Sequence, residues 1–304
     1  MTTTTTALRR QIGSASDLEA VVRTMKASAA SAIGQYERSV AALAHYAQTV
    51  ELGLGVCLRA AYPQGPRARA GPTRPEGTAV HAVVFGSDQG LVGRFNEVIV
   101  DHAVSQLGAS MTKARIWAVG ERVHARLLDA GVTPMGAYGV PGSVALITRL
   151  VGQILLAAEV LQPDPTSTAQ GLALHLCYNR PTGAGYEPVC QQLLPLDAHW
   201  QRDLARRPWP TTRLPEVLGT SPRALRGFIR EHLFVSLFRA CAESSCSENA
   251  SRLAAMQRAD RNIGELLEAL RASFHRLRQS GIDEELFDVI AGFDAMASEA
   301  VRAR

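Results

Sequence analysis

The chain has 304 residues, which is enough for one or two domains with a substantial core. Its hydrophobic fraction of 46% and charged fraction of 20% exclude a wholly disordered protein. A formal net charge of +4 gives no case for nucleic acid as a partner. The longest uncharged window, residues 130–148, is interrupted by prolines and glycines, so we expect no membrane-spanning helix.

The five cysteines are scattered singly and form no Cys-x-x-Cys pair. An odd number at irregular spacing predicts free thiols in a reducing compartment. The N-terminal threonine run is followed by Leu8-Arg9-Arg10 and has no apolar signal-peptide core, so we do not expect secretion.

All 15 prolines lie between Pro63 and Pro222. Because proline breaks helices, the proline-free ends can form long ones. The predicted organisation has five parts: an N-terminal coiled-coil helix at 1–62, a linker at 63–78, an α/β globular domain at 79–196, a second linker at 197–221 and a C-terminal coiled-coil helix at 222–304.

Apolar or small residues recur in both arms at steps of three and four, and so narrow a stripe is typical of a coiled-coil seam. In the N-terminal arm they are Leu8, Ile12, Ala15, Leu18, Val22, Met25, Ala29, Ile33, Tyr36, Val40, Leu43, Ala47, Val50 and Leu54. In the C-terminal arm they include Leu225, Ile229, Leu233, Leu237, Leu253, Met256, Ile263, Leu266, Leu270, Phe274, Ile282, Leu286, Val289 and Phe293.

Helix length decides how these arms can be used. At about 1.5 Å per residue the first arm would run roughly 75 Å, and the second more than about 110 Å if it is unbroken. A globule of this chain length has a radius of gyration of only about 19 Å. The arms must therefore pair with each other and bury surface against something else. The alternative is an ordinary helical bundle with breaks, for which Ser244–Ser247 and Gly281 are the weak points.

Between the arms, strand-like runs alternate with amphipathic helices. We expect strands at 79–85, 114–119, 132–140, 172–178 and 186–194, and helices at 96–107, 121–130 and 144–161. This alternation predicts a Rossmann-like α/β domain with a largely parallel sheet. The turn at 179–185 predicts a hairpin at one edge of that sheet.

The segment Gly86–Gly93 follows the first expected strand and precedes a helix, where phosphate-binding loops lie. It has neither the glycine spacing of the dinucleotide fingerprint nor the Gly-Lys-Ser/Thr end of a Walker A loop. Asp88 would also repel a phosphate. The pattern therefore favours a structural turn or a contact surface over a nucleotide site.

No other motif supports chemistry in this chain. The eight histidines form no zinc pair, and there is no nucleophile elbow, so we expect no catalytic residue, no metal and no cofactor. The arginine-rich stretch 202–213 contains two prolines and carries modest charge, which favours a surface linker over a nucleic-acid patch.

Five segments, in the right order, resemble the gamma subunit of the F-type ATP synthase. Ile12–Ala30 resembles the family's opening helix, and Ser87–Asn96 resembles its Thr-Asp-Arg-Gly-Leu-Cys-Gly-x-x-Asn loop. Gln192–Leu196 matches its Gln-Leu-Leu-Pro-Leu. Glu248–Asn262 and Arg278–Gly292 resemble its two C-terminal blocks. The usual basic residues late in the first helix are missing, so the chain resembles a divergent member.

The resemblance implies an antiparallel coiled coil of the two terminal helices that serves as a central rotor shaft. It implies catalytic and non-catalytic alpha/beta-type subunits around the shaft, and an epsilon-type subunit and a membrane rotor ring at the globular domain. The chain would then be a non-catalytic subunit, peripheral on the cytoplasmic face of the bacterial membrane. It also implies partner contacts at Arg278, Gln279 and Glu285, with Met25 near the same region.

Two alternatives stay open on the sequence alone. One is a nucleotide-binding enzyme that uses the middle α/β domain, and the other is a coiled-coil adaptor unrelated to ATP synthesis. Nothing in the chain indicates whether the coupled ion would be H⁺ or Na⁺, because the ion ligands of the family lie in the membrane ring.

Overall fold

The computed structural model describes residues 4–62, 80–160, 173–183, 185–213, 215–217 and 221–302. The chain divides into two compact units. The first, here called the helical unit, comprises residues 1–28 and 253–304, and the second, the α/β unit, comprises residues 29–252. Two long helices, α1 (Thr5–Ala61) and α6 (Ser221–Arg302), contribute to both units. The expected linker at 63–78 lies outside the described residues.

The α/β unit is built on a five-stranded sheet with the order β3-β2-β1-β4-β5. The strands are β1 (Val80–Phe85), β2 (Arg115–Val119), β3 (Gly136–Tyr138), β4 (Ala173–Thr182) and β5 (Gly185–Leu194). All neighbouring pairs are parallel except β4 and β5, which form an antiparallel hairpin at one edge. The predicted α/β fold and edge hairpin are confirmed.

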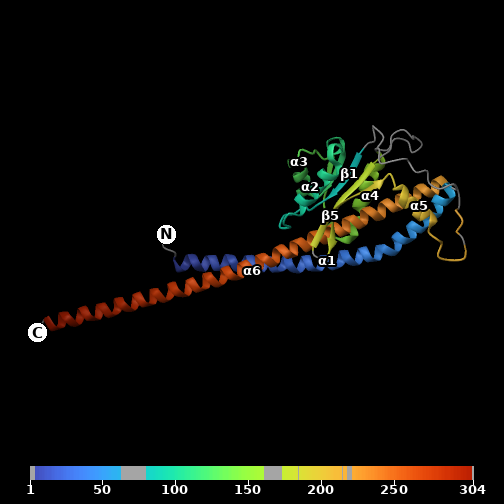
Figure 1. The fold of residues 1–304 in the computed structure, drawn as a ribbon. Coiled ribbons are helices and arrows are strands. Elements are labelled where there is room, and N and C mark those ends of the chain that lie inside the picture. The colour runs from blue at the N-terminus through green and yellow to red at the C-terminus, as the bar shows by residue number, and fades with distance from the viewer. Residues whose placement is uncertain are drawn as a thin grey trace. The chain divides into compact units, whose positions relative to one another are not determined.

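Helices cover both faces of the sheet (Figure 1). On one face α2 (Phe95–Leu107) and α3 (Glu121–Asp129) enclose a core with Ile99, Ile116 and Leu127 at its centre. On the other face α4 (Val144–Val160) packs together with parts of α1 and α6. A short 3₁₀ helix, η1 (Gly108–Lys113), leads from α2 to β2. The long helices are thus part of the second core of this unit.

Two expected elements differ in the structure. The third strand is only Gly136–Tyr138, because the amide of Val132 bonds back to Leu127 and closes the end of α3. The segment expected to be a linker at 197–221 contains helix α5 (Ala198–Arg206). The Asp197 side chain caps α5 by accepting hydrogen bonds from the amides of His199 and Trp200. Leu204 of α5 is buried against two leucines of α1.

In the helical unit, α1 buries a residue once every seven positions, at Leu8, Ala15 and Val22. A strict seven-residue repeat is the signature of a left-handed coiled coil. On α6, Met256 and Leu267 are buried in the same unit. Within the paired part of the unit, Leu18 (58%) and Leu266 (51%) of the predicted stripe are exposed, and so are its members Ile282, Leu286 and Val289 near the end of α6. The neighbours of Leu18 and Leu266 are less exposed, since Glu19 is partly buried and Leu267 is buried.

The two helical segments of this unit run antiparallel. Lys26 Nζ lies 2.6 Å from Asp260 Oδ2, and the Arg9 guanidinium lies 5.6 Å from the centre of the Phe274 ring. As the α1 number falls, the α6 number rises, as antiparallel pairing requires. The ammonium of Lys26, which occupies a seam position, holds the pKa of Asp260 below its usual value. The predicted antiparallel coiled coil is therefore confirmed.

Neither weak point interrupts α6, which is helical from Ser221 to Arg302. Residues 240–248, which include the serine cluster, are all buried. Packing on every side of this turn outweighs the low helix propensity of serine, because helices in proteins owe most of their stability to tertiary contacts.

The expectation of five free thiols is wrong for one pair. Cys177 of β4 and Cys190 of β5 form a disulfide. The hairpin explains the pairing, because its register places these two residues directly opposite each other although they are 13 positions apart. Cys57, Cys241 and Cys246 are free and buried.

We predict that stability falls in acid because of His81, which is fully buried in β1 and packs edge-on against Trp117. Neither ring nitrogen has a hydrogen-bond partner in the structure. Burial, aided by Arg115, lowers the pKa of His81 to about 4. The folded state therefore resists protonation that the unfolded state accepts below about pH 6.5, so stability is full above that pH and is lost towards pH 4.

Between pH 7 and pH 5 this single group is expected to cost about 1–2 kcal/mol. Thermal unfolding across that range should show a smaller acid loss in His81→Phe than in the parent chain. Exposed His45→Phe serves as the control and should behave like the parent. Equal acid sensitivity of the His81→Phe variant and the parent would contradict the assignment.

Candidate partner-binding site

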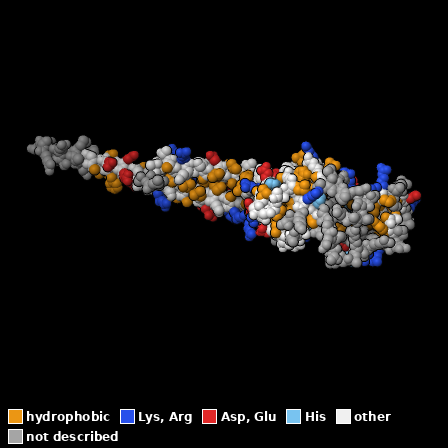
Figure 2. Space-filling view, turned by 90° about the horizontal axis from the view of Figure 1, so that it is seen from above, with side chains coloured by type: hydrophobic (Ala, Val, Ile, Leu, Met, Phe, Trp, Pro, Cys, Tyr) orange, Lys and Arg blue, Asp and Glu red, His pale blue; other side chains and the backbone are white. Residues whose placement is uncertain are grey.

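The C-terminal end of α6 exposes large apolar side chains. Residues 282–292 are all exposed. Phe287 is 69% exposed and Val289 is 68% exposed. The others on this stretch are Ile282, Leu286 and Ile290. Figure 2 shows further hydrophobic side chains on the surface of the helical unit. A single helix with this many uncovered apolar groups needs a binding partner.

The predicted contact residues lie on this exposed helix, except for Met25. Arg278, Gln279 and Glu285 are exposed, and none of them makes a hydrogen bond or ion pair within the described residues. At 100° per residue, Arg278 and Glu285 share one face with Ile282 and Val289. Charged groups thus alternate with apolar groups along one face, which suits a protein partner with both kinds of surface.

Met25 lies elsewhere in the helical unit. It is partly buried on α1, next to Lys26, which pairs with Asp260. Arg278 follows Asp260 by five turns of α6, about 27 Å along the axis. Met25 and Arg278 are thus separated along the helical unit, and the contact of Met25 with a partner subunit stays a prediction.

The glycine-containing loop after β1 is held by its own polar groups. Asp88 accepts hydrogen bonds from the amides of Glu121 (3.0 Å) and Val140 (2.8 Å). Asn96 bonds the Ser87 amide and hydroxyl at 2.9 and 2.8 Å. Both carboxylate oxygens of Asp88 are thus committed to the backbone at the ends of β2 and β3. The predicted structural turn fits this geometry, and a phosphate at this position would face a carboxylate.

Ser251 ties the same loop to α6. Its hydroxyl donates to the carbonyl of Val92 at 2.5 Å. Leu91, which precedes Val92 in this loop, has a left-handed backbone (φ 61°) and a largely exposed side chain. The loop therefore presents an apolar side chain on a fixed backbone, which is a property of a contact surface.

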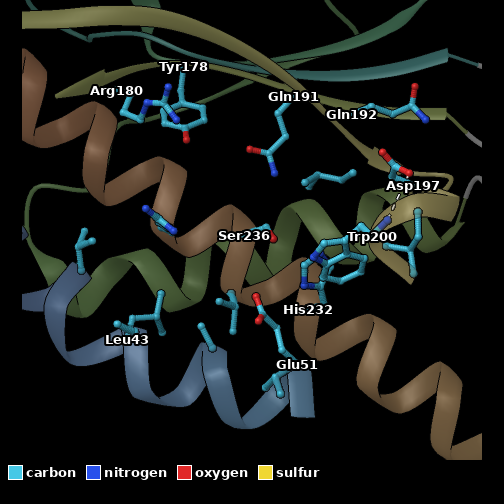
Figure 3. Close-up of a pocket in the computed structure, with 18 of the residues that line it drawn as sticks. Leu43, Glu51, Tyr178, Arg180, Gln191, Gln192, Asp197, Trp200, His232 and Ser236 are labelled. Atoms are coloured by element: carbon cyan, nitrogen blue, oxygen red, sulfur yellow. Dashed lines mark hydrogen bonds between the residues drawn. The ribbon is translucent and has the colours of Figure 1, made fainter. Parts of the chain in front are cut away.

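A cavity of about 590 Å³ lies within the α/β unit, between α1, α6 and the β4–β5 hairpin (Figure 3). Its α1 wall contains the apolar Val40, Leu43 and Ala47, and also Glu51. The opposite side carries polar groups, among them Arg180 and Gln191. Trp200 of α5 and His232 of α6 stack at one end, with ring centres 4.7 Å apart. Burial lowers the pKa of His232, so this ring is neutral at physiological pH.

Within the described residues, no group of three or more His, Cys, Asp or Glu side chains could hold a metal ion. None of the helices described is both long enough and hydrophobic enough to span a lipid bilayer.

A protein-family model described as ATP synthase matches residues 4–296. The chain belongs to this family. The ATP synthase gamma chain of Paramagnetospirillum magneticum is 27% identical over 301 residues, covering 95% of this chain and 98% of the relative. That of Brevibacillus brevis is 26% identical over 298 residues, with the same two coverages.

Solved structures share the fold. The rotor of the Euglena gracilis mitochondrial ATP synthase matches with a TM-score of 0.57 at 15% identity, covering 91% of this chain and 98% of the other. A chain of the OSCP/F1/c-ring structure from the same organism matches with a TM-score of 0.61 at 16% identity, covering 96% and 94%. The arrangement of a central α/β sheet and two long terminal helices is thus that of known ATP synthase rotor chains.

Sequence reasoning missed two features of the ATP synthase chain. The role of Asp88 as a double acceptor could not be found, because its two donors lie 33 and 52 positions away. The cavity beside the hairpin is closed at one end by α5. Asp197, which caps this helix, was the one signal in the sequence that could have predicted it.

Proposed function

We propose that this chain is the gamma subunit, the central rotor shaft, of a rotary F-type ATP synthase. The observation that carries the proposal is the uncovered apolar end of α6, in a chain that matches the family over nearly its whole length. Such an end is expected of a shaft tip that rotates within a sleeve of other subunits. The chain itself is non-catalytic and contributes to an assembled ion-translocating ATPase.

The two units suit different partners. The helical unit contacts catalytic and non-catalytic alpha/beta-type subunits, and the α/β unit contacts an epsilon-type subunit and the membrane rotor ring. The complex places the chain on the cytoplasmic face of the bacterial membrane as a peripheral component. In the expected five-part division, the helices at 1–62 and 222–304 form the shaft and 79–196 forms its base.

The shaft acts through contact energy. Three catalytic sites of identical sequence surround one asymmetric shaft, so each meets a different face at any moment. A contact can shift a conformational equilibrium only by its difference in energy between the two states. The mixed face of Arg278, Ile282, Glu285 and Val289 supplies such differences, because polar and apolar groups alternate along it. Rotation then carries the bias from one site to the next.

We expect the double variant Arg278→Ala/Gln279→Ala to lower ATP hydrolysis of the assembled complex about fivefold, at the lower end of typical coupling energies. The fold should not change, because both side chains are exposed and make no described bond. Arg276→Ala is the control for Arg278, since Arg276 lies on nearly the opposite side of α6 and, among the described residues, bonds to Ser273. Glu285→Ala and Glu284→Ala form a second matched pair, in which only the first should lower activity.

The test requires the chain to be coexpressed with the alpha- and beta-type subunits of its own organism and purified as a complex. Wild-type unfolding curves with reduced hydrolysis would support the contact. Equal activity of the double variant and of Arg276→Ala would remove Arg278 and Gln279 from the interface. Failure of the wild-type chain to copurify with those subunits would overturn the proposed function itself.

A further inference from the structure

The disulfide between Cys177 and Cys190 joins a central strand to the edge of the sheet. Cys177 lies on β4, which is hydrogen-bonded to strands on both sides, and it is fully buried. Cys190 lies on β5, the last strand of the sheet, and is only partly buried. Their Cα atoms are 4.1 Å apart at paired register positions, well inside the limit of about 7 Å beyond which cysteines cannot be bridged.

The hairpin around this pair contains two prolines and is antiparallel up to its turn. Pro188 stands two positions before Cys190, opposite Asn179, and Pro181 stands opposite Tyr186. Both pairs fall at the non-hydrogen-bonded positions of the ladder, as the Cys177–Cys190 pair does, so the missing proline amides remove no bond between the two strands. Beyond Cys190 towards the turn, the side-chain ties of β5 include the exposed Arg180–Glu187 ion pair, the contact between the rings of Phe95 and Tyr186, and a hydrogen bond between Tyr186 and Ser251. Exposed ion pairs contribute little. The disulfide adds a covalent constraint to this half of the edge strand.

The three other cysteines differ from this pair in reactivity. Burial raises the pKa of Cys241 to about 12 and that of Cys246 to about 11, and it also raises the pKa of Cys57. Because the thiolate is the reacting form, these thiols are inert at neutral pH. Cys190 combines partial exposure with a partner sulfur in place.

We propose that Cys177 and Cys190 form a reversible thiol–disulfide exchange site that locks the β5 edge of the α/β unit, with Cys190 as the sulfur that meets the external reagent. In the reducing direction, an external thiolate attacks Cys190, the Cys177–Cys190 bond breaks, and the electron pair and then a proton go to Cys177. A second external thiol attacks the mixed disulfide and releases Cys190. In the oxidising direction, the Cys190 thiolate attacks a low-molecular-weight disulfide such as oxidised glutathione and releases one thiolate. Cys177 then displaces the second.

The site does not depend on the proposed rotor function. Its consequence for the molecule lies in the wall of the 590 Å³ cavity, because Tyr178 and Gln191 adjoin the two cysteines in sequence and line that cavity. The bond thus fixes one side of the cavity, and its reduction releases that side.

The first test follows the chemistry in the full-length chain. The chain is equilibrated in glutathione buffers from fully reduced to fully oxidised, alkylated, and cleaved with chymotrypsin, which cuts after Tyr178 and Tyr186 and so separates the two cysteines. We expect the fraction of disulfide-linked peptide to rise from a minor to a major share as the buffer becomes oxidising, and to fall again when the buffer is made reducing. Cys177→Ala should trap a glutathione adduct on Cys190, whereas Cys190→Ala should trap almost none on Cys177. No linked peptide in any buffer, or equal adducts at both positions, would overturn the proposal.

The second test measures the lock. Reduction should speed hydrogen exchange of the β5 amides about tenfold or more and leave α2 and α3 unchanged, since edge strands open locally before the core does. Cys190→Ser keeps the three buried thiols and should show fast β5 exchange with or without reductant. Slow exchange in the reduced parent chain, or a reductant effect that persists in Cys190→Ser, would show that the pair does not lock the strand.

Discussion

A chain cut after Gln279 is expected to fold like the parent but to lose about tenfold or more of the coupled ATPase activity of the complex. The cut removes residues 280–304, and residues 282–292 of this segment are all exposed. The cut preserves the contact between Arg9 and the Phe274 ring, which joins the two helices of the helical unit. The free energy of unfolding should change by less than about 0.5 kcal/mol, because almost no buried surface is lost.

A full-length variant separates loss of length from loss of apolar contact. Leu286→Ser/Phe287→Ser/Val289→Ser keeps the helix but removes three of its largest exposed apolar groups. It should lower activity in the same direction as the truncation, with an unchanged unfolding transition. Full activity in both variants, measured as ATP hydrolysis by purified complexes, would show that the exposed end of α6 is not a working contact surface.

Gly120→Val is expected to destabilise the chain by about 3 kcal/mol or more, close to 10 °C in melting temperature. Gly120 has φ 120° and ψ 137°, a conformation that side chains with a Cβ rarely adopt. A Cβ at this position would lie 2.7 Å from the Ser87 carbonyl oxygen and 2.9 Å from the Ser87 nitrogen. Both are backbone atoms of the loop fixed by Asp88, so they cannot move aside cheaply.

Gly152→Ala is the matched control for this substitution. Gly152 lies inside α4, and a Cβ added there would meet no atom within 4 Å. Alanine should stabilise the helix by about 0.5–1 kcal/mol, because it is the better helix former. Differential scanning calorimetry of both variants gives the comparison. Equal melting temperatures would mean that the loop at the end of β1 is much softer than its hydrogen bonds indicate.

The periodic parts of the fold could be predicted from sequence because each depends on local pattern. The seven-residue recurrence of Leu8, Ala15 and Val22 predicts a long paired helix before any contact is known. The short, mainly apolar run Val80–Phe85 likewise predicts a buried strand from its local composition. All six of its residues are buried. The choice between neighbours such as Leu266 and Leu267 could not be predicted, because both are leucine and only the partner helix decides between them.

The features that depend on register or on distant partners could not be predicted. The pairing of Cys177 with Cys190 follows from the β4–β5 alignment, which the spacing of cysteines alone does not reveal. The continuity of α6 through Ser244–Ser247 depends on the core around it, and its local composition indicates a bend. The exposure of Arg278 and Glu285 fits the contacts that the family resemblance implies. The distance of Met25 from these residues follows from the pairing of Lys26 with Asp260 across the coiled coil, which the sequence alone does not give.

Rotation of this chain inside its complex tests the central claim most directly. Ser105 is exposed on α2, so Ser105→Cys can carry a bead or a gold particle without altering the fold. The alpha- and beta-type subunits are fixed to a glass surface and ATP is added. Our account predicts that the probe turns in one direction, in three main steps per revolution, and stops when ATP is removed. ATP hydrolysis by the same immobilised complexes with a stationary probe would contradict the assignment of this chain as the rotor shaft.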